Sequence, residues 1–486
     1  MLFNSLVYIL LFLPLSAFVY YSIAKLNYAF LNKSILIFFS LFFYAWWDYN
    51  YLFLILSSIA FNYFLGFRLI EQHKKDKKQH ILLVIGITLN LLILIYYKYL
   101  NFFVETVNNI TEANLSINKI ALPLAISFFT FQQIAYLVDS FQGKVKDKNF
   151  IDYLLFVCFF PQLISGPIVH HSQLIPQFKN LKKIFFSTIA PGMTIFIIGL
   201  SKKVLIADNM SAIADKLFYY DYLDSLSAYE SWIGTLAYTF EIYFDFSGYS
   251  DMAVGSALIF GIYLPINFSS PYKTQSIISF WRAWHITLSA FLKNYLYIPL
   301  GGNRKGTLRK YCNLFITMLL GGLWHGASFQ FIFWGMAHGI YLIINHLYRN
   351  YILAFFPNSF LNSRMYKHLA WLITFIAVVS AWVFFKANEF QDSVLILKAM
   401  YGLGSETNIF NIYESKTIIS FKVAVVLLIA FFMPNSNQII GFQGNSIGKP
   451  MLRYNYLSFL LFFILLLFCI LKLMTSGYEE FIYRFF

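Results

Sequence analysis

Long apolar stretches, separated by short charged loops, run through almost the whole of this 486-residue chain. Many hold about 20 residues, the length that an α-helix needs to cross the hydrocarbon core of a bilayer. The strands of a membrane barrel would instead alternate apolar and polar residues. The pattern therefore predicts membrane-spanning helices, and their ranges are close to 2–21, a second segment that ends near 46, 51–67, 81–100, 122–140, 184–206, 232–247, 251–266, 311–323, 327–347, 368–386, 418–433 and 454–474.

Two regions interrupt this pattern. Residues 150–169 are apolar but contain Pro161, Gly166 and Pro167, and lysines flank them on both sides. Broken backbone is tolerated at membrane depth only where protein or a cavity surrounds it, so we expect a re-entrant hairpin there. Residues 268–310 are half polar and basic, which predicts amphipathic and re-entrant helices on the cytoplasmic side. The chain shows no internal repeat, so we expect one all-α polytopic domain over 1–486 with about 11–13 transmembrane helices.

The basic loops give an orientation. The segment 68–78 and the lysines between 144 and 148 are expected in the cytoplasm, because cytoplasmic loops carry an excess of Lys and Arg. The tail 475–486 carries acidic residues, which favours the outside. The first apolar stretch lacks a basic start and a small-residue cleavage site, so it is interpreted as a retained helix. Both termini are then expected outside.

Composition supports the membrane class. Hydrophobic residues make up 59% of the chain and charged residues only 12%, and the mean hydropathy is +0.64. A soluble domain carries roughly 25% charged residues. The net charge of +14 is explained by the basic cytoplasmic loops, so no nucleic-acid partner is expected. The three cysteines have no metal-like spacing, and we expect neither a disulfide nor a metal.

One histidine lies in a segment without any charged residue. Between Phe315 and Tyr348 there is no Asp, Glu, Lys or Arg, and His325 lies in the sequence Leu-Trp-His-Gly. An ionisable residue at bilayer depth indicates a functional site by default. Histidine is also the side chain best suited to move a proton near neutral pH. The alternative is a packed histidine at a helix interface.

Other polar residues lie in the middle of the chain. The carboxylates Glu241, Asp245 and Asp251 are expected to pair with cationic or backbone donors. For these carboxylates, a structural role in holding a bent pair of helices together is favoured over a catalytic role. Arg282 and His285 are three residues apart, and a helix would place both on one face.

Three further histidines are expected to have other roles. On a continuous helix, His338 would lie about 220° from His325, which favours a structural role. His170 and His171 lie at the rim of the predicted hairpin, where interfacial or surface roles are expected.

Seven motifs in this order resemble those of the membrane-bound O-acyltransferase family, in particular its bacterial polysaccharide O-acetyltransferase branch of the alginate and peptidoglycan type. The motifs are 122–132, 159–167, 243–252, 280–285, 295–304, 323–326 and 382–387. The resemblance extends from the first residues of the chain to the last.

The resemblance implies a reaction and a site. His325 would be the catalytic histidine, buried where a cytoplasmic and an extracytoplasmic cavity meet, and His285 would orient His325 or the substrate. Acetyl-CoA would be the acyl donor, and His325 would act as general base on an acceptor hydroxyl. The partner would be an extracytoplasmic acetyltransferase, and the protein itself would lie in the bacterial cytoplasmic (inner) membrane. Candidate residues for binding substrate or coenzyme are Arg282, Trp324, Asn303 and Arg304.

The C-terminal residues 477–486 resemble the aromatic tail of related acyl-transfer systems, in which a tyrosine carries the acyl group. Tyr483 matches that tyrosine, whereas Arg484 replaces an aromatic residue. Since a phenol has an unperturbed pKa of about 10, it attacks an acyl donor only with a base nearby. An aromatic anchor at the membrane interface is the alternative interpretation.

Three functions remain open at this point. The first is acetyl transfer across the membrane to an extracytoplasmic polysaccharide, either peptidoglycan or an alginate-like polymer. The second is D-alanyl transfer to teichoic acid, which uses another acyl donor. The third is a transporter in which the histidine and carboxylates form a proton relay, although the matching halves typical of many transporters are not found.

Overall fold

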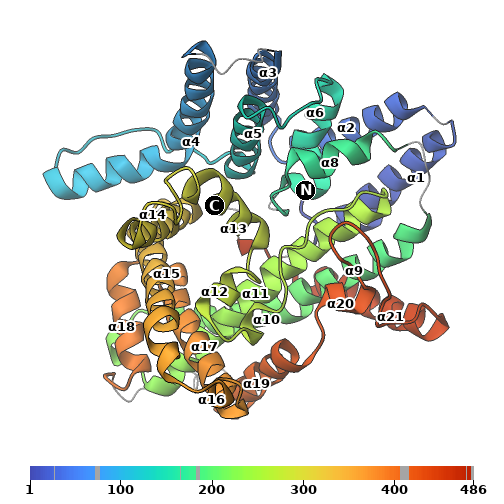
Figure 1. Ribbon diagram of the computed structural model, residues 1–486. Coiled ribbons are helices and arrows are strands. Elements are labelled where there is room, and N and C mark those ends of the chain that lie inside the picture. The colour runs from blue at the N-terminus through green and yellow to red at the C-terminus, as the bar shows by residue number, and fades with distance from the viewer. Residues whose placement is uncertain are drawn as a thin grey trace. The chain divides into compact units, whose positions relative to one another are not determined.

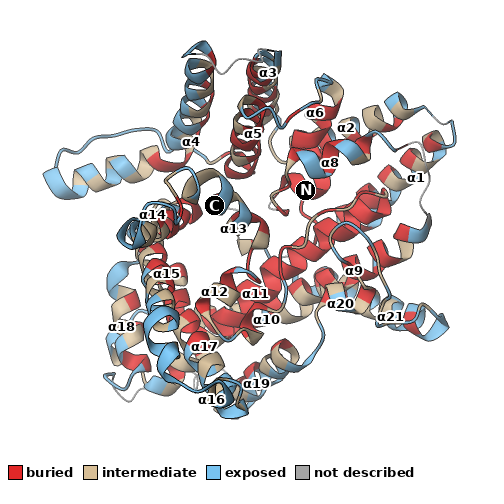
Figure 2. Cartoon of the chain, viewed as in Figure 1, coloured by how far each residue is buried: buried red, intermediate tan, exposed pale blue. Residues whose placement is uncertain are grey.

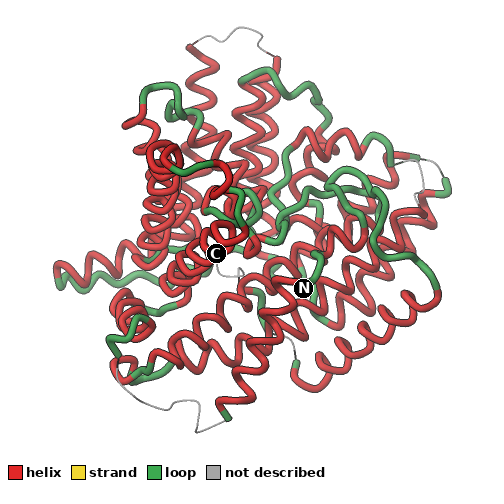
Figure 3. The backbone as a smooth tube through the Cα atoms, turned by 60° about the horizontal axis from the view of Figure 1, so that its bottom comes forward, coloured by secondary structure: helices red, strands yellow, loops and turns green. Residues whose placement is uncertain are grey.

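The computed structural model describes residues 1–26, 28–71, 77–164, 166–181, 186–404, 415–477 and 479–482. Helices form nearly all of the regular structure in these ranges (Figure 3). The described residues contain no β-strand, and one isolated bridge pairs Phe442 with Ile447. The prediction of an all-α chain is confirmed.

The chain divides into two compact units. The first consists of Met1–Leu200, Tyr249–Ile266 and Ser436–Phe486, and the second of Ser201–Gly248 and Asn267–Asn435. The single membrane domain expected over 1–486 remains a prediction.

The first unit contains the N-terminal helices and the end of the chain (Figure 1). Side-chain caps fix several helix starts: Asn149 Oδ1, for example, accepts the backbone N–H groups of Ile151 and Asp152 at 2.9 and 3.2 Å. The helices are the π-helical turn η1 (Tyr8–Phe12), α1 (Leu13–Ala24), α2 (Ala29–Ala45), α3 (Asn50–Glu71), α4 (Lys77–Thr111), α5 (Ile126–Phe141), α6 (Phe150–Cys158), α7 (Phe160–Leu163), α8 (His171–Phe178), η2 (Phe186–Thr188), α9 (Ile189–Ser201), α20 (Ser436–Ile440) and α21 (Tyr456–Ser476).

The second unit holds the histidine motifs. Its helices are η3 (Lys202–Ala207), α10 (Asp208–Phe218), η4 (Leu223–Ser225), most of α11 (Ala228–Ile259), η5 (Pro271–Lys273), α12 (Ile277–Trp281), α13 (Ile286–Leu292), η6 (Lys293–Tyr297), α14 (Thr307–His325), α15 (Phe329–Leu347), η7 (Tyr348–Ile352), η8 (Leu353–Phe355), α16 (Asn358–Leu361), α17 (Arg364–Lys386), α18 (Phe390–Met400) and α19 (Lys416–Phe432).

Among the described residues, five helices are long and apolar enough to cross a membrane. They are Asn50–Glu71, Lys77–Thr111, Ile189–Phe218, Arg364–Lys386 and Tyr456–Ser476. Two shorter apolar helices cover Tyr8–Ala24 and Ala29–Ala45. Each of these seven helices overlaps a span expected from the sequence, and the chain is a multi-pass membrane protein. The number of about 11–13 crossings stays a prediction.

One pair of predicted spans is wrong. The stretches 232–247 and 251–266 were expected as separate spans, but α11 is one helix of 32 residues from Ala228 to Ile259. Gly248 lies in its middle, and a single internal glycine costs a helix only about 1 kcal/mol relative to alanine. Figure 2 shows that α11 is buried along most of its length, so packing compensates for that cost.

The two interrupted regions are broken into short helices, as expected. Within 150–169, helix α6 ends at Cys158 and the four-residue α7 begins at Phe160, and residues 166–170 before α8 form no regular structure. Within 268–310, the short helices η5, α12, α13 and η6 follow one another. Whether either region re-enters the membrane stays a prediction.

Helices α14 and α15 lie side by side and approach each other closely (Figure 1). A Cβ added at Gly322 would lie 2.2 Å from the carbonyl oxygen of Phe331, and one added at Gly335 would lie 2.5 Å from that of Met318. In lipid, small residues allow such close backbone contact between helices. The two glycines therefore fix the α14–α15 hairpin that ends α14 at His325.

We predict that Gly335→Ala destabilises the protein by about 1–3 kcal/mol, the usual cost of forcing extra volume into a packed interface. The thermal unfolding midpoint of the detergent-purified protein should fall. Ile344→Ala, an exposed position of the same helix, is the matched control and should leave the midpoint unchanged. An unaltered midpoint for Gly335→Ala would contradict the prediction, because it would show that α14 and α15 accommodate the added methyl group without loss of stability.

Candidate active site

His325 is the last residue of α14 and is almost fully buried. The next residue, Gly326, has an extended backbone, and a Cβ there would lie 2.0 Å from the ring of Phe331. The chain then turns within three residues into α15 at Phe329. His325 is thus held where a helix ends, at a turn that admits no side chain at position 326.

Three aromatic rings surround the imidazole of His325, and we call them the aromatic cage. The ring centroids of Trp324, Trp334 and Phe385 lie 4.9, 5.0 and 5.2 Å from that of His325. All three side chains are buried. Because such a site excludes bulk water, a polar or charged group that enters it interacts more strongly with the imidazole than it would in solution.

His285 lies between α12 and α13 and is fully buried. Its Nδ1 lies 3.1 Å from Oδ1 of Asn267. The hydroxyl and the backbone N–H of Thr287 donate to the same atom, at 2.9 and 3.3 Å, so that atom must be the amide oxygen. An amide oxygen only accepts hydrogen bonds, which requires the proton of His285 on Nδ1 and leaves the lone pair on Nε2.

The free side of His285 faces aromatic groups. Its Nε2 has no hydrogen-bond partner among the described residues. Phe246 packs edge-on at 4.7 Å, and the ring of Trp324 lies at 6.2 Å. His285 lies in a turn outside the candidate spans, and burial lowers its pKa to about 3, so the ring is neutral at physiological pH. His285 and His325 therefore both border Trp324, and the structure brings these three predicted residues together.

The expectation that Arg282 and His285 share a helix face is wrong. Helix α12 ends at Trp281, and His285 has a left-handed backbone with φ of 42°. A helix cannot continue through such a residue. As a result, His285 points into the interior whereas Arg282 is exposed.

The angular argument for His338 also fails, because α14 and α15 are separate helices. His338 is buried, and its Nδ1 accepts the indole N–H of Trp281 at 3.3 Å. Its ring lies 4.8 Å from that of Trp334, so it packs behind the aromatic cage. Trp334 and His338 are four residues apart in α15, a spacing that places both on one helix face and that the sequence analysis did not use.

The remaining predicted residues lie elsewhere. Asn303 and Arg304 are exposed in the turn before α14, where the side-chain amide of Asn313 donates to the carbonyl of Gly302 at 2.9 Å. The structure does not place them in the aromatic cage. Tyr483 lies outside the described residues. The proposed binding roles of Asn303, Arg304 and Arg282, and the carrier role of Tyr483, stay predictions.

Helix α11 carries four carboxylates, and the three that were singled out from the sequence each have a partner, as expected. Two form buried ion pairs with lysines, and the third accepts a hydrogen bond from a serine hydroxyl. The contacts are Lys203–Asp245 at 2.7 Å, Lys386–Glu241 at 3.8 Å and Ser436–Asp251 at 2.6 Å. Buried charges of this kind are costly to leave without partners, which agrees with a role in holding helices together.

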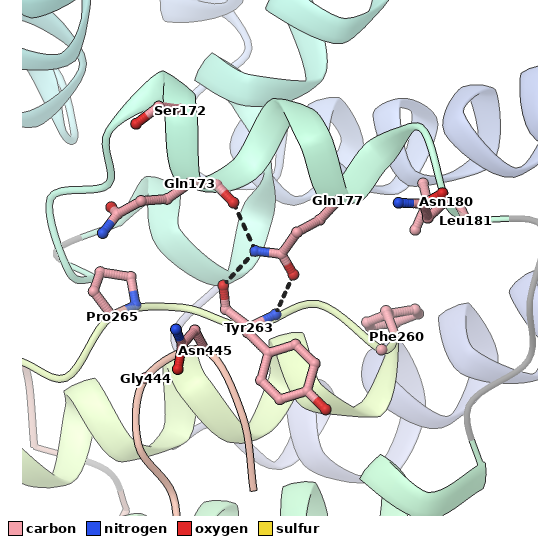
Figure 4. Close-up of a pocket in the computed structure, with 11 residues that line it drawn as sticks. Ser172, Gln173, Gln177, Asn180, Leu181, Phe260, Tyr263, Pro265, Gly444 and Asn445 are labelled. Atoms are coloured by element: carbon pink, nitrogen blue, oxygen red, sulfur yellow. Dashed lines mark hydrogen bonds between the residues drawn. The ribbon is translucent and has the colours of Figure 1, made fainter.

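A cavity of about 480 Å³ lies in the first unit, apart from the residues above. Figure 4 shows Gln177 at its centre: the side-chain N–H groups donate to the carbonyls of Gln173 and Tyr263 at 2.8 and 2.9 Å, and its oxygen accepts the N–H of Tyr263 at 2.8 Å. No acidic or basic residue lines the cavity. It contains none of the predicted site residues.

Comparison with known proteins gives the family. The model of the membrane-bound O-acyltransferase family matches residues 80–388. The peptidoglycan O-acetyltransferase of Helicobacter pylori is 45% identical over 431 residues, which cover 83% of this chain and 80% of that protein. The probable alginate O-acetylase AlgI of Pseudomonas putida is 37% identical over 503 residues and covers 99% of both chains.

A more distant similarity is found with a protein named for a different acyl transfer. The teichoic acid D-alanyltransferase of Streptococcus thermophilus is 26% identical over 233 residues, which cover 46% of this chain and 56% of that protein. The family match covers α14 and α15 with His325 at their turn, together with His285 and the aromatic cage. This all-helical, multi-pass membrane enzyme belongs to the membrane-bound O-acyltransferase family.

Proposed function

We propose that this enzyme takes acetyl from cytoplasmic acetyl-CoA and passes it across the membrane for O-acetylation of an extracytoplasmic polysaccharide. The observation that carries the proposal is the placement of His325 at the end of α14, inside the aromatic cage, whose Trp324 also borders the neutral His285. Relatives that are 37–45% identical are named as O-acetyltransferases or O-acetylases of polysaccharides, which supports the choice of acetyl and of the acceptor class.

In the proposed reaction, neutral His325 removes the proton from an acceptor hydroxyl as its oxygen attacks the thioester carbonyl of acetyl-CoA. The C–O ester bond forms and the C–S bond breaks. The leaving thiolate then takes the proton from the imidazolium, which returns His325 to its neutral form and releases CoA as the thiol. Because a thiolate leaves easily, deprotonation and placement of the acceptor are the larger tasks of the protein.

Two further groups near His325 are suited to orient the reactants. Nε2 of His285 carries a lone pair, and the indole N–H of Trp334 is a donor; neither has a hydrogen-bond partner among the described residues. A donor aimed at a carbonyl oxygen stabilises the negative charge that develops there during acyl transfer. We assign this role to Trp334, whereas His285 accepts a hydrogen bond from the acceptor or positions His325. Trp324 would separate the two histidines by a fixed spacing.

The basic segment before α14 is proposed to bind the coenzyme. Arg282 and Arg304 are exposed, and their guanidinium groups can bind phosphate with two parallel hydrogen bonds. Asn303 can add a further donor. A solvated cytoplasmic surface would carry the same charges, so this assignment depends on the cytoplasmic location predicted for 268–310.

The partner and the acceptor follow from the same proposal. An extracytoplasmic acetyltransferase would receive the acetyl group on the outer side of the membrane. The enzyme itself would lie in the bacterial inner membrane, with both termini outside. Peptidoglycan and an alginate-like polymer are both supported by relatives. D-Alanyl transfer is less well supported, since that relative covers 46% of the chain. A transporter is less well supported, because Asp245 and Asp251 are held by Lys203 and Ser436, and the matching halves typical of many transporters are not found.

We predict that His325→Ala lowers acetyl transfer about 10²- to 10⁴-fold, the usual contribution of a general base. The measurement is transfer or release of label from radiolabelled acetyl-CoA in proteoliposomes. His368→Ala, an exposed histidine of α17, is the matched control and should retain full activity. If His325→Ala equals the wild type at the same thermal midpoint, the assignment of the active site is wrong.

A second prediction concerns Asn267, which fixes the tautomer of His285. Asn267→Leu should lower kcat about 5- to 10-fold, since one lost hydrogen bond is worth about 1–1.5 kcal/mol. Asn267→Asp retains an acceptor for Nδ1 and should restore most of kcat, with KM for acetyl-CoA unchanged in both variants. Equal losses in both variants would show that Asn267 supports the fold only.

A third prediction tests the acyl carrier. In the carrier reaction, the Tyr483 phenolate oxygen attacks the thioester with His325 as base, and acetyl then passes from the tyrosyl ester to the partner. Tyr483→Phe should abolish protein-bound label from radiolabelled acetyl-CoA, while exposed Tyr456→Phe should retain it. Full acetylation of polysaccharide in cells that carry Tyr483→Phe would contradict the carrier role and favour an aromatic anchor.

A further inference from the structure

Three side chains far from His325 in the sequence meet in the first unit. Asp139 is near the end of α5, and His170 and His171 begin α8. Nε2 of His171 lies 3.2 Å from Oδ2 of Asp139, and Nε2 of His170 contacts the same oxygen. Asp139 and His171 are buried, whereas the His170 side chain is 32% exposed. Two imidazoles and one carboxylate thus converge on one point that is open on one side.

The geometry is close to that of a metal site. One ligand atom from each of the three residues lies within 4.8 Å of the other two. A tetrahedral zinc ion with bonds of about 2.0–2.1 Å holds its ligand atoms about 3.4 Å apart. The His171–Asp139 pair already has this spacing, so only a small withdrawal of the half-exposed His170 is needed. The histidine rings lie 4.2 Å apart with their Nε2 atoms directed to the same oxygen.

We propose that Asp139, His170 and His171 bind a divalent zinc ion, with water in the fourth position on the exposed side of His170. Imidazole ligands favour zinc over magnesium or calcium, which prefer oxygen ligands. The site would join the end of α5 to the start of α8 and is independent of the acyl-transfer chemistry of His325.

The surrounding groups are compatible with bound metal. Nδ1 of His170 lies 2.6 Å from the hydroxyl of Ser172, so in the metal-bound form it can carry the proton and donate to that oxygen. Nε2 is then left with the lone pair that zinc requires, and the weaker backbone contact of Ser172 with Nδ1, at 3.3 Å, is lost. Lys144 contacts Oδ1 of Asp139 at 3.3 Å, but its side chain is 61% exposed and can move into solvent.

The alternative is that the cluster is a metal-free network of ion pairs between Asp139, Lys144 and the two histidines. Such a network stabilises the same helix junction but retains no zinc. Metal content therefore separates the two interpretations, whereas thermal stability or acetyl transfer alone would not.

The test uses the full-length protein, purified in detergent without a histidine tag. After incubation with zinc sulfate and removal of unbound metal, elemental analysis should give about one zinc per chain, and cobalt substitution should give the visible absorption of a four-coordinate site. His170→Ala and His171→Ala should each weaken zinc affinity at least about 100-fold. Loss of a residue that only hydrogen-bonds to a metal ligand typically costs less than this. His368→Ala, an exposed histidine of α17, should bind zinc like the wild type.

The outcomes are separate. Stoichiometric zinc in the wild type and in His368→Ala, lost in both ligand variants, supports the site. A wild type without stoichiometric zinc, or ligand variants that bind it equally well, overturns the proposal and leaves the ion-pair network. His170 is half-exposed, so His170→Ala should fold even if a substitution of the buried His171 does not.

Discussion

The close approach of α14 and α15 is the constraint on which the candidate active site depends. In a bilayer, helices gain nothing by hiding apolar surface from water, and close van der Waals contact takes over as a main attraction. Gly322 and Gly335 permit that contact. The turn between the helices is short. His325 therefore ends α14 close to the start of α15, where the ring of Trp334 packs against the imidazole. A wider hairpin would remove Trp334 from the aromatic cage.

Fixed partners for buried polar groups are the second organising rule. Asn267 determines the tautomer of His285, Trp281 determines the accepting atom of His338, and Lys203 neutralises Asp245. In a medium of low dielectric constant each such pair has one favoured arrangement, because the penalty for an unpaired buried group is large. His285 thereby carries its proton on Nδ1, whereas Nδ1 of His338 is the accepting atom.

The sequence predicted those features that depend on local composition. The apolar stretches gave the helical class and the overlapping spans, and the uncharged neighbourhood of His325 singled out that residue. Features set by tertiary packing were missed. A glycine inside α11 did not break it, and a left-handed residue between Arg282 and His285 separated two side chains that a helix would align. The meeting of Asp139 with His170 joins residues 31 apart, which no local pattern indicates.

The left-handed backbone of His285 has an energetic cost. Glycine adopts φ near 42° without strain, whereas a non-glycine residue held there costs about 1–3 kcal/mol. A glycine would relieve that strain but would lose the buried hydrogen bond to Asn267. Position 285 therefore combines a strained backbone with a fixed side chain, and strain of this kind persists only where the surrounding structure holds the residue in place.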